Sequence, residues 1–273
     1  MLTFTFLLFL FYFWGLMTQT EGHVGHTIEN GIATIEFFHP ASNSLPGAIL
    51  GELAATINEV GQNKEVSVII LRSAGEKAFC AGASFDELIA ISTEEGGLKF
   101  FSGFAHVINA MRKCPKLIIG RIQGKAVGGG VGMAAATDYA IACEGASVKL
   151  SELAVGIGPF VVGPVVERKV GVSPFAQLAI EATSWRPAEW AKDHGLYAEV
   201  HSTIAEMDEA INSLAQKLAS SNPDAMAELK TIFWQGTDHW DTLLTERAAI
   251  SGKLVLSDFT RNAIQKFKAK PAK

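Results

Sequence analysis

The amino-acid sequence predicts an α/β protein with a mostly parallel sheet and a helical C-terminal region. Three patterns lead to this fold class. Candidate strands alternate with candidate helices between residues 26 and 143. The run VSVIIL at 66–71 is almost entirely apolar, as expected of a strand that is covered on both faces. After Pro159, helical patterns dominate.

The first elements are a hairpin, a helix and a strand. The run HTIENGIATIEFF at 26–38 surrounds Asn30-Gly31, a dipeptide preferred in two-residue hairpin turns because both central residues take positive φ. Apolar residues then recur at helical spacing across 45–60, and the strand 66–71 follows. Strands that alternate with helices in this way are typical of parallel sheets.

The same alternation continues along the chain. We expect a helix around 100–111, a strand at 117–122, a short helix from the glycine run near residue 129 and a strand at 139–143. The later helices are expected at 165–170, 174–182, 187–194 and 205–219, with one short strand at 196–200. Two or three helices follow Asn222-Pro223, and their large apolar residues require a partner surface on the main domain or on another subunit.

These patterns divide the chain into an apolar extension at 1–24, a core domain at 25–220 and a helical region at 221–273. The run MLTFTFLLFLFYFWGL at 1–16 lacks the positive start of a secretory signal and is shorter than the ~20 apolar residues of a membrane span. An over-extended start site, with the protein beginning at Met17, is the favoured interpretation. The alternative is an anchor that holds the protein at a membrane.

Composition narrows the function classes. A net charge of -5 and a pI of about 5.8 give no broad basic surface, which argues against a protein that wraps nucleic acid. Cys80, Cys114 and Cys143 have no close spacing, which favours reduced thiols in the cytoplasm over a disulfide framework. No His-Glu-x-x-His or Cys-x-x-Cys pattern occurs, so no metal site is predicted.

Two glycine-centred turns are candidates for chemistry. One is the run FCAGASFD at 79–86, and the other is AVGGGVG at 126–132. Each joins a strand to a helix N-terminus, where free amide groups favour negative charge, so the pair suits an oxyanion. A phosphate cradle is one alternative, although the Gly-Lys-Ser/Thr of such a loop is absent. Tight packing of helix on strand is the structural alternative.

A third segment, KLSELAVGIGPF at 149–160, makes the pattern specific. The motifs Phe-Cys-Ala-Gly-Ala, Gly-Lys-Ala-Val-Gly-Gly-Gly and Ser-Glu-x-x-x-Gly-Ile-x-Pro occur in the order and approximate spacing of the crotonase superfamily, also called the enoyl-CoA hydratase/isomerase family. The chain resembles this family from about residue 28 to its C-terminus. The resemblance implies the crotonase fold, a spiral of strand-strand-helix units forming two sheets, with a C-terminal helical oligomerisation region that forms trimers or hexamers.

The resemblance also implies site residues. The oxyanion amides fall on Ala83 and Gly129, and the catalytic carboxylate falls on Glu152. The first glutamate of the family's hydratases falls on Gly132, so that carboxylate is missing. The residues expected to bind coenzyme A (CoA) are Ala81, Gly82, Ser84, Phe267 and Lys270, and an ordinary solvated lysine tail is the alternative for the last two. Cys80 has no histidine partner in the sequence and is expected to be a buried filler.

The missing carboxylate directs the expected reaction. Hydration normally shares its proton transfers between two carboxylates, whereas moving a double bond needs one base. We therefore expect an enoyl-CoA isomerase of fatty acid metabolism, with Glu152 as proton shuttle, the CoA thioester as substrate and no cofactor. The alternatives are a hydratase or acyl-CoA hydrolase that uses another acid or base, and a catalytically silent acyl-CoA binder.

Overall fold

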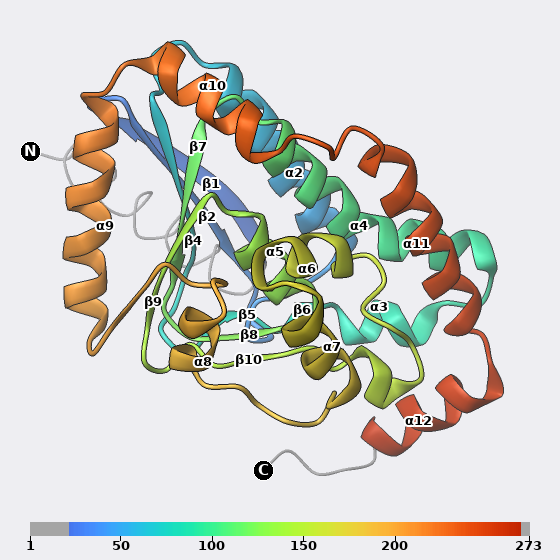
Figure 1. Ribbon diagram of the computed structural model, residues 1–273. Helices are drawn as coiled ribbons and strands as arrows, with labels where there is room; N and C mark the ends of the chain where they lie inside the picture. The colour runs from blue at the N-terminus through green and yellow to red at the C-terminus, as the bar shows by residue number, and fades with distance from the viewer. Residues whose placement is uncertain (1–21, 269–273) are drawn as a thin grey trace, which may run out of the picture.

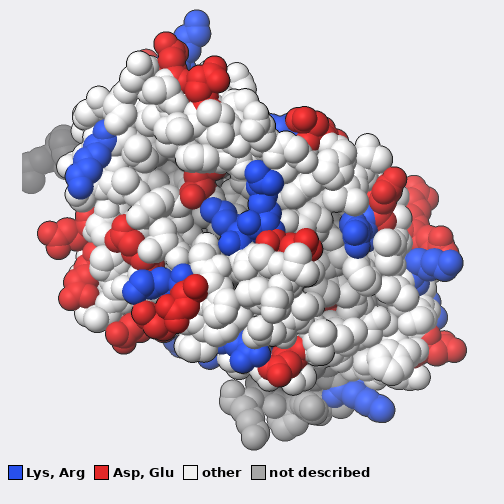
Figure 2. Space-filling view, viewed as in Figure 1, with Lys and Arg blue, Asp and Glu red and all other residues white. Residues whose placement is uncertain are grey.

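The computed structural model of the protein describes residues 22–268 (Figure 1). The apolar run at 1–16 and Lys270 lie outside the described residues. Among the residues described, no helix is long and apolar enough to cross a bilayer. On the face seen in Figure 2, acidic and basic side chains are interspersed without one continuous basic field.

A six-stranded sheet forms the centre of the molecule, in the order β1-β2-β4-β7-β9-β11. Its strands are β1 (His23–Glu29), β2 (Ile32–Phe38), β4 (Val68–Ser73), β7 (Leu117–Ile122), β9 (Tyr139–Cys143) and β11 (Glu199–His201). Only the β1–β2 hairpin is antiparallel within this sheet. Asn30 and Gly31 take φ values of 52° and 78° at its turn, which confirms the predicted hairpin.

Both faces of this sheet are covered, as the apolar strand predicted. Val68 and Ile70 of β4 pack in a cluster with Met207 of α9 (Ile204–Ala219), whereas Ile69 and Leu71 face the main core. Successive strand residues point to opposite faces, so one apolar run supplies both clusters. In Figure 1, α9 covers one face alone, and α2 (Gly47–Gln62), α4 (Glu94–Lys113) and α5 (Gly129–Ala136) lie on the other.

Two smaller sheets hold the glycine turns. β10 (Val148–Lys149), β8 (Lys125–Val127) and β5 (Ala78–Cys80) form one of them in parallel, and β3 (Ser44–Leu45) pairs with β6 (Gly82–Ala83) in the other. These strands have two or three residues each, too few for a periodic pattern, and the sequence did not predict them.

The predicted helices are present, with shifted ends. The second half of the chain contains α6 (Gly163–Val170), α7 (Val172–Ile180), α8 (Ala188–Asp193), α10 (Pro223–Phe233), α11 (Trp240–Leu254) and α12 (Asp258–Lys268). The helix expected at 100–111 begins earlier, at Glu94, because Thr93 caps it by accepting a hydrogen bond from the Gly96 amide. The strand expected at 196–200 is shorter and later, at Glu199–His201.

Part of the surface that covers the C-terminal helices lies within the same chain, where α11 packs against α4. α11 crosses α4 closely, since a Cβ atom on Gly97 would lie 2.6 Å from Gly252 Cα. Glycine on both helices therefore brings the two backbones together. α4 also carries Phe100, Phe101 and Phe104 of the cavity described below, so this contact fixes one wall of the candidate site.

Candidate active site

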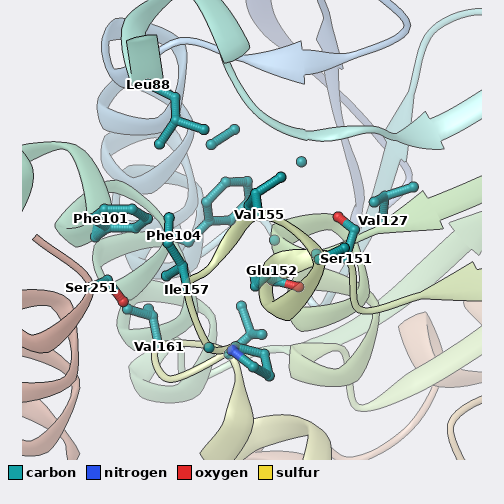
Figure 3. A pocket seen from close by; sticks show the side chains of 18 of the residues that line it. Leu88, Phe101, Phe104, Val127, Ser151, Glu152, Val155, Ile157, Val161 and Ser251 are labelled. Atoms are coloured by element: carbon teal, nitrogen blue, oxygen red, sulfur yellow. The ribbon is translucent and has the colours of Figure 1, made fainter. Parts of the chain in front are cut away.

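A cavity of about 460 Å³ lies between α4, the two glycine turns and the 3-10 helix η1 (Glu152–Val155). Figure 3 shows Phe101 and Phe104 of α4 on one side, with Ser151 and Glu152 across from them. Most of the lining is apolar. Among the described residues that line the cavity, Glu152 is the only carboxylate and Lys149 the only ammonium. The three predicted motifs thus meet at one cavity.

The two glycine turns lie directly against each other. Gly82 has a φ of 94°, and a Cβ atom on it would lie 3.2 Å from the Val127 carbonyl oxygen and 3.9 Å from the Gly129 nitrogen. A Cβ atom on Gly130 would lie 2.4 Å from the Cys80 carbonyl oxygen, which no side chain tolerates. The glycines are needed for this approach, in addition to any chemistry.

Both predicted oxyanion residues line the cavity. Gly129 is the first residue of α5, so its amide has no acceptor within the helix and is free for a ligand. Ala83 lies in β6, and its carbonyl accepts a hydrogen bond of 2.8 Å from the Ser44 hydroxyl, which orients this turn. Phe104 forms the floor beneath Gly129, where a Cβ atom would lie 2.3 Å from the ring. That the two amides hold an oxyanion remains a prediction.

Glu152 carries an unpartnered oxygen into this space. As a residue it is only partly buried, but its Oε2 is inaccessible to solvent and has no hydrogen-bond partner. Its Oε1 would lie 2.9 Å from a Cβ atom on Gly128. Burial raises the pKa of Glu152 to about 7, and a hydrogen bond from its own backbone amide offsets part of that rise. A carboxyl group with this pKa can release and regain a proton at neutral pH.

The loop that carries Glu152 is held in place by α12. Gly156 ends η1 with a φ of 83°, and its carbonyl accepts a hydrogen bond of 3.1 Å from the Thr260 hydroxyl. The Ile157 amide donates to the Glu152 carbonyl at 3.0 Å, which closes the turn. α12 therefore fixes a loop far from it in sequence.

The position of the missing carboxylate is closed by another side chain. Gly132 is buried in α5, and a Cβ atom on it would lie 2.5 Å from Val162 Cγ1 and 2.8 Å from Val162 Cβ. Val162 itself lines the cavity, whereas Gly132 does not. No other carboxylate enters the vacated space from the described residues that line the cavity.

Only some of the remaining predicted residues line the cavity. Ala81 and Gly82 line the cavity, but Ser84 does not, and its hydroxyl caps α3 (Phe85–Ala90) by accepting from the Glu87 amide at 3.3 Å. Phe267 belongs to α12, with its side chain outside the described residues. Burial raises the pKa of Cys80 to about 12, so this thiol stays protonated, as expected of a filler.

Sequence reasoning missed the cationic side of the cavity. Lys149 lines it and lies 4.5 Å from the ring centre of Trp185, and Lys125 lies 5.1 Å from the same ring. Burial, and secondarily the charge of Lys125, lower the pKa of Lys149. No motif joins these residues, because Trp185 comes from a loop that only the fold brings near. The described residues contain no group of three or more His, Cys, Asp or Glu that could hold a metal ion.

Comparisons with known proteins identify related sequences. A family model described as enoyl-CoA hydratase/isomerase matches residues 27–270. A peroxisomal Delta(3,5)-Delta(2,4)-dienoyl-CoA isomerase of Arabidopsis thaliana is 28% identical, and the match covers 93% of this chain and 93% of the relative. A probable enoyl-CoA hydratase of Bacillus subtilis is 28% identical, with 89% of this chain and 95% of the relative covered.

Solved structures are similar in fold. The crystal structure of an enoyl-CoA hydratase from Bacillus halodurans matches with a TM-score of 0.83 and 20% sequence identity, over 89% of this chain and 99% of that one. Identity at this level supports the fold alone. The predicted α/β fold with C-terminal helices is thereby confirmed, and the structure adds the two-stranded sheet β3–β6 to it.

Proposed function

The chain belongs to the enoyl-CoA hydratase/isomerase family, the crotonase superfamily that its motifs resemble, and we propose that within this family it moves the double bond of an enoyl-CoA thioester. The observation that carries the proposal is Glu152, the only carboxylate among the described residues of the cavity wall, with a buried, unpartnered oxygen. A single base of this kind suffices for isomerisation.

The reaction begins at the alpha carbon of a 3-enoyl-CoA. The Glu152 carboxylate takes a proton there, and the electron pair moves to the thioester oxygen as the double bond shifts into a dienolate. The amides of Ala83 and Gly129 donate to that oxygen. Glu152 then returns its proton to the gamma carbon, and the product is the conjugated 2-enoyl-CoA. A pKa of about 7 suits a group that must both accept and donate a proton.

The cavity wall supports an uncharged acyl chain as substrate. Phe101, Phe104 and Ile157 line the space beyond the glycine turns (Figure 3). Lys149, the only ammonium among the described residues of the cavity wall, belongs to β10 and pairs with Val127 of the second turn, so it belongs with the turns rather than with the aromatic wall. CoA is the carrier part of the substrate, and neither a metal nor another cofactor takes part in the proposed steps.

We also propose that the C-terminal helices mediate assembly into a trimer or hexamer, and that the enzyme acts in fatty acid metabolism. Leu229, Ile232 and Phe233 of α10 are between 45% and 55% exposed, which is high for three large apolar residues on one short helix. An oligomer of this chain would cover them.

Glu152→Gln tests the proposal. Wild type should convert a 3-enoyl-CoA to its conjugated isomer, seen as a rise in the ultraviolet absorbance of the enoyl thioester. The variant should lose about 10³-fold in kcat, because the amide cannot take the proton. The exposed Glu144→Gln serves as the matched control and should keep wild-type rates.

Other outcomes identify the alternatives. Equal rates for Glu152→Gln and wild type would show that Glu152 is not the catalytic base. Loss of absorbance when wild type meets a 2-enoyl-CoA would identify a hydratase, and release of free CoA would identify a hydrolase. Saturable acyl-CoA binding without any turnover would identify a binding protein.

A further inference from the structure

One face of the α5 N-terminus presents two glycines four residues apart. The Gly132 amide donates to the Gly128 carbonyl at 3.2 Å, so the two positions are one helical turn apart. The Glu152 carboxylate lies against the first position, and Val162 lies against the second. Glu152 and Val162 line the same cavity. A carboxylate on residue 132 would therefore meet Val162 at the edge of the cavity that Glu152 lines.

Val162 is held firmly over Gly132. It is 3% exposed and lies at the start of α6, where its carbonyl accepts a hydrogen bond of 3.1 Å from the Val166 amide. Valine branches at Cβ, so its isopropyl group has few rotamers with which to move aside. The approach of 2.5 Å to a Cβ position on residue 132 leaves no room for any longer side chain there.

We propose that Val162 determines reaction specificity, because its isopropyl group fills the space in which a second carboxylate would bind and activate water. The proposal rests on the proposed function and deepens it. In hydration, the water oxygen bonds to the beta carbon, one proton of that water goes to a base, and another proton reaches the alpha carbon. Val162 offers an apolar surface where that water would stand, so the conjugated 2-enoyl-CoA formed by Glu152 leaves the site without being hydrated.

Substitutions at residues 132 and 162 separate the need for a carboxylate from the need for space. Gly132→Glu alone should not create a hydratase, because the new side chain meets Val162. Val162→Gly alone should not create one either, because it adds space without a carboxylate. Only the pair Gly132→Glu/Val162→Gly removes both close Val162 atoms and supplies the carboxylate, so hydration should depend on the two changes together.

The experiment compares wild type, both single variants and the pair. Each is incubated with crotonyl-CoA, and hydration is followed as loss of the conjugated thioester absorbance. The pair should hydrate at least about tenfold faster than either single variant, since a positioned acid or base contributes about 10²–10⁴-fold. Gly132→Glu/Val161→Gly is the matched control. Val161 also lines the cavity and is 6% exposed, but Val162 and Ile108 supply the three atoms nearest to residue 132's Cβ position.

Two results would overturn the proposal. Gly132→Glu alone could hydrate as fast as the pair, or the folded pair could bind acyl-CoA and gain no hydration. Circular dichroism and acyl-CoA binding show that each variant is folded. If the pair does not fold, Gly132→Asp/Val162→Gly repeats the test with less side-chain volume, and the same two results apply to it.

The outcome is separable from that of the proposed function. Isomerisation of a 3-enoyl-CoA by wild type and Glu152→Gln is measured in parallel. Absence of isomerisation in wild type would defeat the proposed function, whatever the pair does. If wild type isomerises the 3-enoyl-CoA but the double variant gains no hydration, only the proposed role of Val162 is wrong.

Discussion

Asp138 and Glu152 both have buried carboxylate oxygens, but their surroundings differ. Asp138 lies between β7 and α10, where its oxygens accept hydrogen bonds from the Ile118 amide at 2.7 Å, from Lys230 Nζ at 2.6 Å and from Trp234 Nε1 at 3.1 Å. The side chains of Asp138 and Lys230 are 5% and 4% exposed. Glu152 has an oxygen without any partner and no basic group paired with it.

The difference separates a buried charge that serves the fold from one that is available for the proposed chemistry. Asp138 is fully paired, so it fixes α10 against the sheet and has nothing left to offer a ligand. Glu152 is left unpaired, which raises the free energy of its ionised form and moves its pKa towards neutrality. An unsatisfied buried group of this kind is expected where a site needs reactivity.

Removing the paired carboxylate should have the largest effect on stability. Asp138→Ala leaves the Lys230 ammonium buried without its partner, so the free energy of unfolding should fall by about 3–5 kcal/mol. Chemical denaturation of the two proteins measures the change. Asp138→Ala/Lys230→Met should recover part of the loss, because it also removes the buried ammonium. A single variant as stable as wild type would contradict the comparison.

Removing the unpaired carboxylate should act in the opposite direction. The pKa of Glu152 is about 7 in the folded protein against a reference value of 4.5, so the folded state keeps its proton at a pH where the unfolded state has lost it. The protonated Glu152 side chain therefore makes its full contribution to the free energy of unfolding below pH 4.5. That contribution is lost as the pH rises through about 7. Glu152→Gln has no such loss and should be more stable by about 3 kcal/mol above that range.

Melting curves of wild type and Glu152→Gln across this pH range check the sign. The two curves should converge in acid and separate in base. A variant that melts below wild type at alkaline pH would show that the carboxylate has a partner in the folded protein.

The pKa of Glu152 should also determine how the reaction rate depends on pH. The base must be ionised to act, so kcat/KM for isomerisation should rise with pH about tenfold per unit and level off above about 7. Initial rates in buffers of constant ionic strength measure the profile. A rate that is already level at mildly acidic pH would mean that Glu152 ionises like an exposed carboxylate.

A single lost hydrogen bond at Asp138 should have the smallest effect. Trp234→Phe keeps an aromatic ring but removes the indole donor, while Ile118 and Lys230 still donate to the carboxylate. The expected cost is about 1 kcal/mol in the free energy of unfolding. Denaturation beside Asp138→Ala shows whether the carboxylate tolerates the loss of one of its donors.

Sequence alone predicted the parts of this protein that depend on local patterns. The hairpin at Asn30-Gly31 and the helices and main-sheet strands follow from turn residues and apolar spacing, with errors of a few residues at their ends. Gly82 and Gly129 were identifiable because each turn contains glycine where a helix begins after a strand. Glu152 was identifiable through its motif.

The missing parts depend on contacts between distant segments. Lys230 and Trp234 reach Asp138 across 92 and 96 residues, and nothing in their local sequence marks them as its partners. Two strands, β9 and β10, and the 3-10 helix η1 separate Val162 from Gly132 in the sequence, and only the fold places its side chain over the glycine. An absent carboxylate was visible in the sequence, but the side chain that fills its place was not.

The hydrogen bond between Thr260 and Gly156 spans 104 residues, and it supports the loop that carries Glu152. Loss of α12 would remove this support without removing any residue of α4 or of the two glycine turns. The position of the Glu152 loop therefore depends on a helix none of whose described side chains lines the cavity.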